Sequence, residues 1–126
     1  EMTIEYANPS VAEADIASID SVRFLSSGKA NHRSLPSIVA ISFAAPISGL
    51  SETLSYDAHR TNFETINGTA RTTTDGSSAW TYSNLEDLEM LCTKIGTVEV
   101  YLSYLALEVT YTEAGADNAI FFGTNF

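Results

Sequence analysis

Residues 97–111 read Thr-Val-Glu-Val-Tyr-Leu-Ser-Tyr-Leu-Ala-Leu-Glu-Val-Thr-Tyr, and their alternation gives the strongest indication of the fold class. Apolar residues fall on even positions from Val98 to Leu102 and on odd positions from Leu105 onward. Alternation with a period of two is typical of a β-strand. A slip of one residue turns every later side chain to the other face unless a β-bulge absorbs it. The segment therefore predicts one long strand with a bulge near Ser103.

Shorter strand-like segments precede this one, and turn residues separate them. They cover residues 19–25, 37–44, 51–56 and 62–68, with a turn cluster at 26–31. Asn67-Gly68 predicts a two-residue hairpin, because both residues tolerate positive φ. Many short strands, frequent turns and no regular alternation of strands with helices indicate an all-β antiparallel sandwich.

One short helix is predicted before the last strand. Asn84 is a good N-cap, and Leu85, Leu88 and Leu91 recur every three residues. Gly96 supplies a stop signal beyond them. A helix this short needs tertiary packing to hold in water. It is therefore expected to act as a plug across one end of the sandwich.

Length and charge bound the function. The chain has 126 residues, enough for one domain, and its hydrophobic share of 44% is that of a globular protein. Sixteen acidic residues against six basic ones give a net charge of -10. Such a surface repels phosphate groups, so direct nucleic-acid binding and adhesion to an anionic membrane are not expected. The acidity serves solubility or complements a basic partner.

The residues that carry most enzyme chemistry do not form a recognisable constellation. Cys92 lies among apolar residues, where a buried and inert thiol is expected. His32 lies in a polar turn, and His59 follows Asp57 by two positions. One Asp–His pair lacks the three or four ligands of a zinc site. The sequence therefore predicts no catalytic residue, no metal site and no cofactor.

Aromatic residues provide an alternative function. Trp80, Tyr82, Tyr101 and Tyr104 could stack on the face of a sugar ring if they are exposed. The competing interpretation is that Trp80, the only tryptophan, belongs to the core.

Both ends of the chain carry apolar residues outside the predicted sandwich. These candidate inter-subunit contacts are Ile4 and Tyr6 at the N-terminus and Ile120, Phe121, Phe122 and Phe126 at the C-terminus. Docked on a neighbouring subunit, each would contribute roughly 1.5–3 kcal/mol. The alternative is that the C-terminal segment folds back over its own core as one more strand. Chain ends are usually ill-ordered unless they dock somewhere, so either arrangement would hold the segment in place.

A family resemblance narrows these alternatives. Residues 76–89 read Gly-Ser-Ser-Ala-Trp-Thr-Tyr-Ser-Asn-Leu-Glu-Asp-Leu-Glu, and residues 104–111 read Tyr-Leu-Ala-Leu-Glu-Val-Thr-Tyr. This combination resembles jelly-roll structural proteins of tailed bacteriophages. In those proteins a Trp-Thr segment leads into a short Asn-Leu helix, and the final strand closes with apolar-x-Val-x-Tyr. The glycine that commonly follows the helix in that family is replaced here by Leu-Cys-Thr at 91–93.

The resemblance covers residues 76–111 and implies both a fold and a role. The implied fold is an all-β, jelly-roll-like antiparallel β-sandwich with one short helix and extended terminal arms. The pattern along the chain, and not the resemblance, gives the expected bounds: a sandwich domain at 19–111 between an N-terminal arm at 1–18 and a C-terminal arm at 112–126. The implied role is that of a virion structural protein, a capsid decoration or minor capsid subunit without enzymatic activity.

The expected partners follow from that role. They are other virion proteins, either a major capsid protein or copies of the same chain in a homo-oligomer. One alternative is a carbohydrate-binding module or a fibre- or tail-associated adhesion domain. The other is an extracellular subunit of a secreted filament.

Overall fold

A computed structural model of the protein describes residues 2–5, 11–45, 47, 50–58, 61–86, 88–115 and 118–122; for residues 2–5, 45 and 118–122 it describes the backbone. Within these residues the chain forms the strands β1 (Met2–Glu5), β2 (Ile16–Ala30), β3 (Ser37–Ala45), β4 (Ser51–Tyr56), β5 (Glu64–Asn67), β6 (Glu89–Ile95), β7 (Val100–Glu113) and β8 (Asn118–Phe122). A 3-10 turn η1 (Glu13–Asp15) and one helical turn α1 (Tyr82–Leu85) complete the elements.

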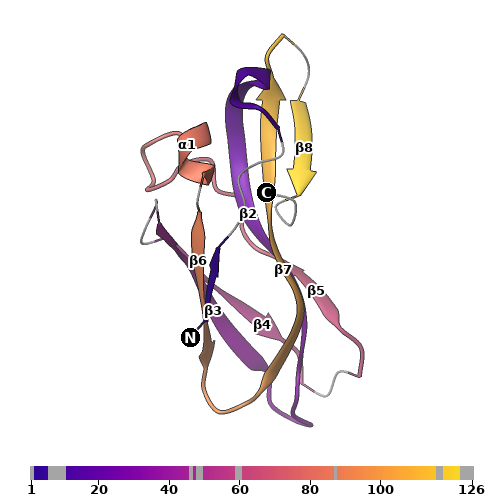
Figure 1. Cartoon of the computed structure of the whole chain (residues 1–126). Helices are drawn as coiled ribbons and strands as arrows, with labels where there is room; N and C mark the ends of the chain where they lie inside the picture. Colours follow the sequence, from indigo (N-terminus) through magenta and orange to yellow (C-terminus); the bar gives the residue numbers. More distant parts are fainter. Residues whose placement is uncertain are drawn as a thin grey trace.

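The strands form two antiparallel sheets, which confirms the predicted β-sandwich. The first sheet has the order β1-β6-β3-β4 and the second has the order β5-β2-β7-β8. Figure 1 shows β2 and β7 running beside each other along the length of the molecule. β8 lies against one half of β7, and β5 lies against the opposite half of β2.

The pairing of β2 with β7 contains the predicted bulge. The ladder extends from Ile16 opposite Glu113 to Ala30 opposite Val100, with three shifts of register. At one of these shifts Ser27 faces Tyr104 while the next residue of β2 faces Leu102, so that Ser103 has no opposite residue. The Ser103 hydroxyl donates to the Ser27 carbonyl oxygen at 3.2 Å. An unpaired residue of this kind is what allows a strand to change phase.

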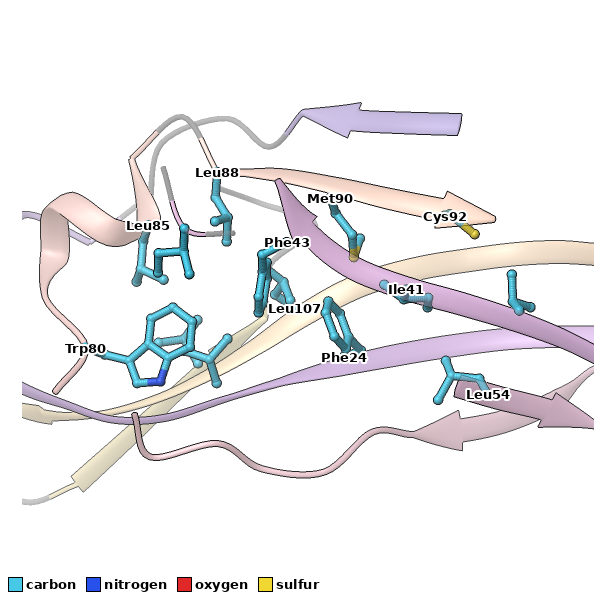
Figure 2. Close-up of a cluster of buried hydrophobic side chains, with 14 of the residues drawn as sticks. Phe24, Ile41, Phe43, Leu54, Trp80, Leu85, Leu88, Met90, Cys92 and Leu107 are labelled. Atoms are coloured by element: carbon cyan, nitrogen blue, oxygen red, sulfur yellow. The ribbon is translucent and has the colours of Figure 1, made fainter. Parts of the chain in front are cut away.

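Apolar side chains between the sheets form a single core (Figure 2). The Phe24 and Phe43 ring centroids lie 4.8 Å apart, and Phe43 meets Trp80 edge-on at 5.7 Å. Such pairs add roughly 0.5–1.5 kcal/mol to simple burial. Cys92 is buried as predicted, and burial raises the pKa of its thiol, which keeps it in the unreactive protonated form.

A buried polar pair fixes the second sheet against β4. The Tyr56 hydroxyl donates to Ser26 Oγ at 2.8 Å, and Ser26 Oγ donates to the Ile66 carbonyl at 3.1 Å. Gly28 makes room for this arrangement. A Cβ atom on Gly28 would lie 2.8 Å from the Tyr56 ring and 3.0 Å from the Tyr101 carbonyl oxygen. Only glycine lets the strand approach this closely.

The predicted helix is wrong in place and extent. Helix α1 is a single turn capped by Thr81, and Asn84 lies inside it, where its Oδ1 accepts from the Thr81 backbone N–H at 2.8 Å. The segment that follows is strand β6, in which Met90 and Cys92 are buried and alternate with partly exposed neighbours. The period of two prevails over the leucine spacing because β6 pairs on both sides, with β1 and β3.

The predicted hairpin at Asn67-Gly68 and the predicted turn at 26–31 are also wrong. β2 continues through Ala30 because β7 and β5 pair with this part of it. After β5 the chain does not turn back: the Gly68 N–H donates to the Phe24 carbonyl, and Arg71 forms an antiparallel bridge with Val22. Two-residue hairpins need a returning strand as a partner. Here the residues that follow β5 continue alongside β2 and do not return along β5.

The sandwich includes strands from both terminal segments. β2 begins at Ile16 and β7 ends at Glu113, each a few residues outside the predicted range of 19–111. β1 and β8 pair with β6 and β7 of the same chain. The described parts of the two predicted arms are therefore edge strands.

Truncation of a central core residue tests this packing. Leu107 on β7 is fully buried, so Leu107→Ala is expected to lower the free energy of unfolding by about 2–5 kcal/mol. Urea unfolding monitored by circular dichroism measures the change. Ile95→Ala is the matched control, because Ile95 is 46% exposed and should cost about 0.5 kcal/mol or less. Equal costs for the two variants would contradict the assigned core.

Candidate functional site

The residues predicted to contact other subunits lie at two edges of the sandwich. Ile4 is in β1 opposite Met90 of β6. Ile120, Phe121 and Phe122 form most of β8, which pairs with β7. Tyr6 and Phe126 lie outside the described residues. The structure thus brings the predicted apolar segments into edge strands of different sheets.

The four edge strands differ in charge. β1, β4 and β5 each contain one glutamate, namely Glu5, Glu52 and Glu64. β8 has the sequence Asn-Ala-Ile-Phe-Phe and carries no charge and no proline. Charged residues and prolines are what natural proteins use to keep an edge strand from pairing with another chain. β8 is therefore the least protected edge among the described strands.

Trp80, the first aromatic candidate for sugar stacking, belongs to the core. It is 4% exposed, its ring packs against Phe43, and its indole N–H donates to the Arg71 carbonyl at 2.9 Å. Figure 2 shows it beneath Leu85 at one end of the cluster. A ring that is 4% exposed offers too little surface to stack on a sugar. The competing interpretation of this tryptophan as a core residue is the one that the structure supports.

Tyr82 is partly exposed, but its hydroxyl is engaged. It donates to the Val11 carbonyl at 2.8 Å and so holds the N-terminal segment against α1. Trp80, Tyr82 and the start of β2 line a shallow hollow of about 240 Å³, which is below the usual range for ligand pockets. This pair is better described as an anchor for the chain than as a binding platform.

Tyr101 and Tyr104 lie on the same face of the second sheet because of the bulge. Tyr101 faces Lys29 and Tyr104 faces Ser27 in the ladder. Residues two apart on one strand point to the same side, and cross-strand partners share a side. Without the unpaired Ser103, two tyrosines three residues apart would point to opposite faces. The Cβ direction of Gly28, toward the buried Tyr56, shows that the shared face is the outer one.

A cation and a third ring complete an aromatic cluster at the end of this face. The Lys29 ammonium lies 5.0 Å from the centroid of the Phe63 ring and 5.8 Å from that of Tyr101. The Asn31 amide donates to the Glu99 carboxylate at 2.9 Å and to the Tyr101 hydroxyl at 3.2 Å. We call Lys29, Asn31, Phe63, Glu99, Tyr101 and Tyr104 the outer-face cluster.

Sequence reasoning found the two tyrosines of this cluster and missed the other members. Phe63 was missed because it precedes the short strand β5, whose pairing with β2 was not predicted. Lys29 was missed because it lies in a segment that was expected to be a turn and is part of β2. The shift of phase in residues 97–111 was the available signal, because it implies that Tyr101 and Tyr104 share a face.

Histidines and metal-binding groups show no cluster in the described part of the chain. His32 Nδ1 accepts the backbone N–H groups of Ser34 and Leu35, at 3.1 and 3.0 Å, and so shapes its own turn. His59 lies outside the described residues. Among the residues with described placement, no three His, Cys, Asp or Glu side chains come together as metal ligands. Within the same residues, no helix has the length and hydropathy to cross a bilayer.

In comparisons with known proteins, no family model, curated protein or solved structure matches the chain.

The loop before Trp80 carries the one strongly shifted carboxyl group among the described residues. The backbone N–H groups of Ser78 and Ser77, together with their hydroxyls, lower the pKa of Asp75 from 3.8 to about 2. Because the folded-state pKa is lowered, these bonds favour the folded loop above pH 3.8, and their contribution is lost as the pH falls through about 2.

An NMR titration of the Asp75 carboxyl carbon tests this assignment. We expect a midpoint near 2 in the folded protein. Exchange of the Ser77 and Ser78 amide protons should accelerate below that pH. A peptide of residues 73–79 is the control and should titrate near the ordinary value of 3.8. The same midpoint in protein and peptide would contradict the hydrogen-bonded loop.

Proposed function

We propose that this protein is a structural subunit of a virus particle, a capsid decoration or minor capsid protein that works by binding other protein chains. The observation that carries the proposal is β8, an uncharged strand at the end of the second sheet. Its proposed partners are copies of the same chain or a major capsid protein.

An edge strand presents a row of backbone N–H and C=O groups that can pair with another strand. Adding a strand to a sheet in this way is a common mode of protein recognition, in which the backbone bonds supply affinity. Within the described part of the chain, β8 has a strand neighbour on one side, β7. The apolar composition of β8 suits burial in such a contact.

The net charge of the protein favours this edge over the others. At -10, two copies repel each other at long range, and close contact between glutamate-bearing strands would add like-charge repulsion. A contact through β8 places no carboxylate of that strand opposite its partner. The strand is also held on a rigid support, because β7 pairs with β2 over most of its length.

The resemblance of residues 76–111 to phage structural proteins supports the virus particle as the place where these contacts are made. In this protein the resembling residues perform structural tasks: Trp80 packs in the core, Asn84 closes the turn at α1, and Val109 faces the core from β7. The resemblance to phage proteins therefore concerns residues that build the sandwich, to which β8 is attached through β7.

Charges placed on β8 test the proposal. Ile120 pairs with Thr110 and Phe122 pairs with Glu108, positions that alternate with the buried Val109, so lysines at 120 and 122 should spare the core. We expect the double variant Ile120→Lys with Phe122→Lys to convert oligomers of the wild type into monomers. Light scattering at several protein concentrations measures the mass.

Ser55→Lys is the matched control, because Ser55 is an exposed residue of the edge strand β4. It adds a charge to a sheet edge without touching β8 and should leave the mass unchanged. The thermal midpoint of each variant confirms that the fold is retained. A wild-type chain that stays monomeric at the highest concentration, or a double variant with unchanged mass, would contradict assembly of copies of this chain through β8.

A further inference from the structure

The outer-face cluster carries an inference beyond assembly through β8. Phe63 and Tyr101 are 46% and 47% exposed and come from different elements. Both rings lie within 6 Å of the same Lys29 ammonium, so they are neighbours on one surface. We propose that this surface binds a neutral polysaccharide, with the rings of Phe63 and Tyr101 stacking on pyranose faces.

The aromatic geometry suits an extended sugar chain. Tyr104 is partly exposed and lies on the same face as Tyr101, two register positions farther along β2. Two residues of a strand span roughly 7 Å, so the tyrosines form a row along the sheet instead of a closed pocket. Pyranose rings present an apolar face of C–H groups, and tyrosine offers a rigid apolar ring with a polar tip.

Polar groups beside the rings match the hydroxyl groups of a sugar. Lys29 and Asn31 are donors, the Glu99 carboxylate is an acceptor, and the Tyr101 hydroxyl is both. The bonds from the Asn31 amide to Glu99 and to the Tyr101 hydroxyl fix the orientation of the phenol before a ligand arrives. Pre-organised polar groups around an apolar platform give specificity at a low entropic cost.

Charge selects a neutral ligand over an acidic one. Lys29 is the only cation of the cluster, and the cluster also holds one carboxylate, that of Glu99, which accepts from the Asn31 amide. The ammonium is held over two rings, an interaction worth roughly 0.5–1 kcal/mol at an exposed site. The remaining charge of the protein is strongly negative, so a polyanion would be repelled.

Affinity electrophoresis in gels containing a soluble polysaccharide tests the proposal. The probes are mannan, mixed-linkage β-glucan and galactan as neutral chains, and alginate as an acidic chain. We expect at least one neutral polysaccharide to retard the protein and alginate not to do so. Tyr101→Ala and Phe63→Ala should each raise the dissociation constant about tenfold or more, as truncation of a central aromatic contact does.

Ile95→Ala is the matched control, because Ile95 is as exposed as Phe63 but belongs to the first sheet. It should bind like the wild type. Tyr101→Phe keeps the ring and should retain most of the affinity, which guards against a folding defect in the alanine variant. No retardation by any neutral probe, or equal losses in Tyr101→Ala and Ile95→Ala, would overturn the proposal. A change of oligomeric mass in Tyr101→Ala without polysaccharide binding would assign the cluster to a protein contact instead.

Discussion

The antiparallel ladder between β2 and β7 holds the other parts of the sandwich in position. These strands have 15 and 14 residues, and their ladder extends from Ile16 opposite Glu113 to Ala30 opposite Val100. No other pairing in the described chain is as long. β5 and β8 are attached to opposite halves of this ladder, and the first sheet covers its inner face. Both proposed contact surfaces, the β8 edge and the outer-face cluster, are therefore positioned by one rigid pair of strands.

The bulge at Ser103 links packing to function. It lets Leu102 and Leu107 face the core although they are five residues apart, and a regular strand would turn one of them outward. The same shift places Tyr101 and Tyr104 together on the outer face. The bulge that buries the leucines on the inner face of β7 therefore also places the two tyrosines in a row on its outer face. A feature required by the core at this point also builds the surface proposed for ligand binding.

Local patterns predicted the parts of this structure that depend on neighbouring residues. The alternation in residues 97–111 gave β7 and its bulge, and the apolar run of β3 was found with nearly its observed bounds. Pairing over long sequence distances was not predictable. Residues 26–30 have the composition of a turn, but they extend as a strand because they pair with β5 and β7. Leu85, Leu88 and Leu91 have helical spacing, yet Leu91 belongs to strand β6. Lys29 and Phe63 lie in the candidate site because β2 pairs with β5 and β7, which local sequence patterns did not predict.

NMR determination of the register of β2 against β7 around Ser103 would show whether the bulge exists. Cross-strand NOEs between backbone protons should place Tyr101 opposite Lys29 and Tyr104 opposite Ser27, with Ser103 facing no residue of β2. That result would establish the bulge and the shared face of the two tyrosines. A continuous register, with Ser103 opposite Ser27, would contradict the account. In that case Tyr104 would turn to the face opposite Tyr101, and the row of rings along the outer face would not exist.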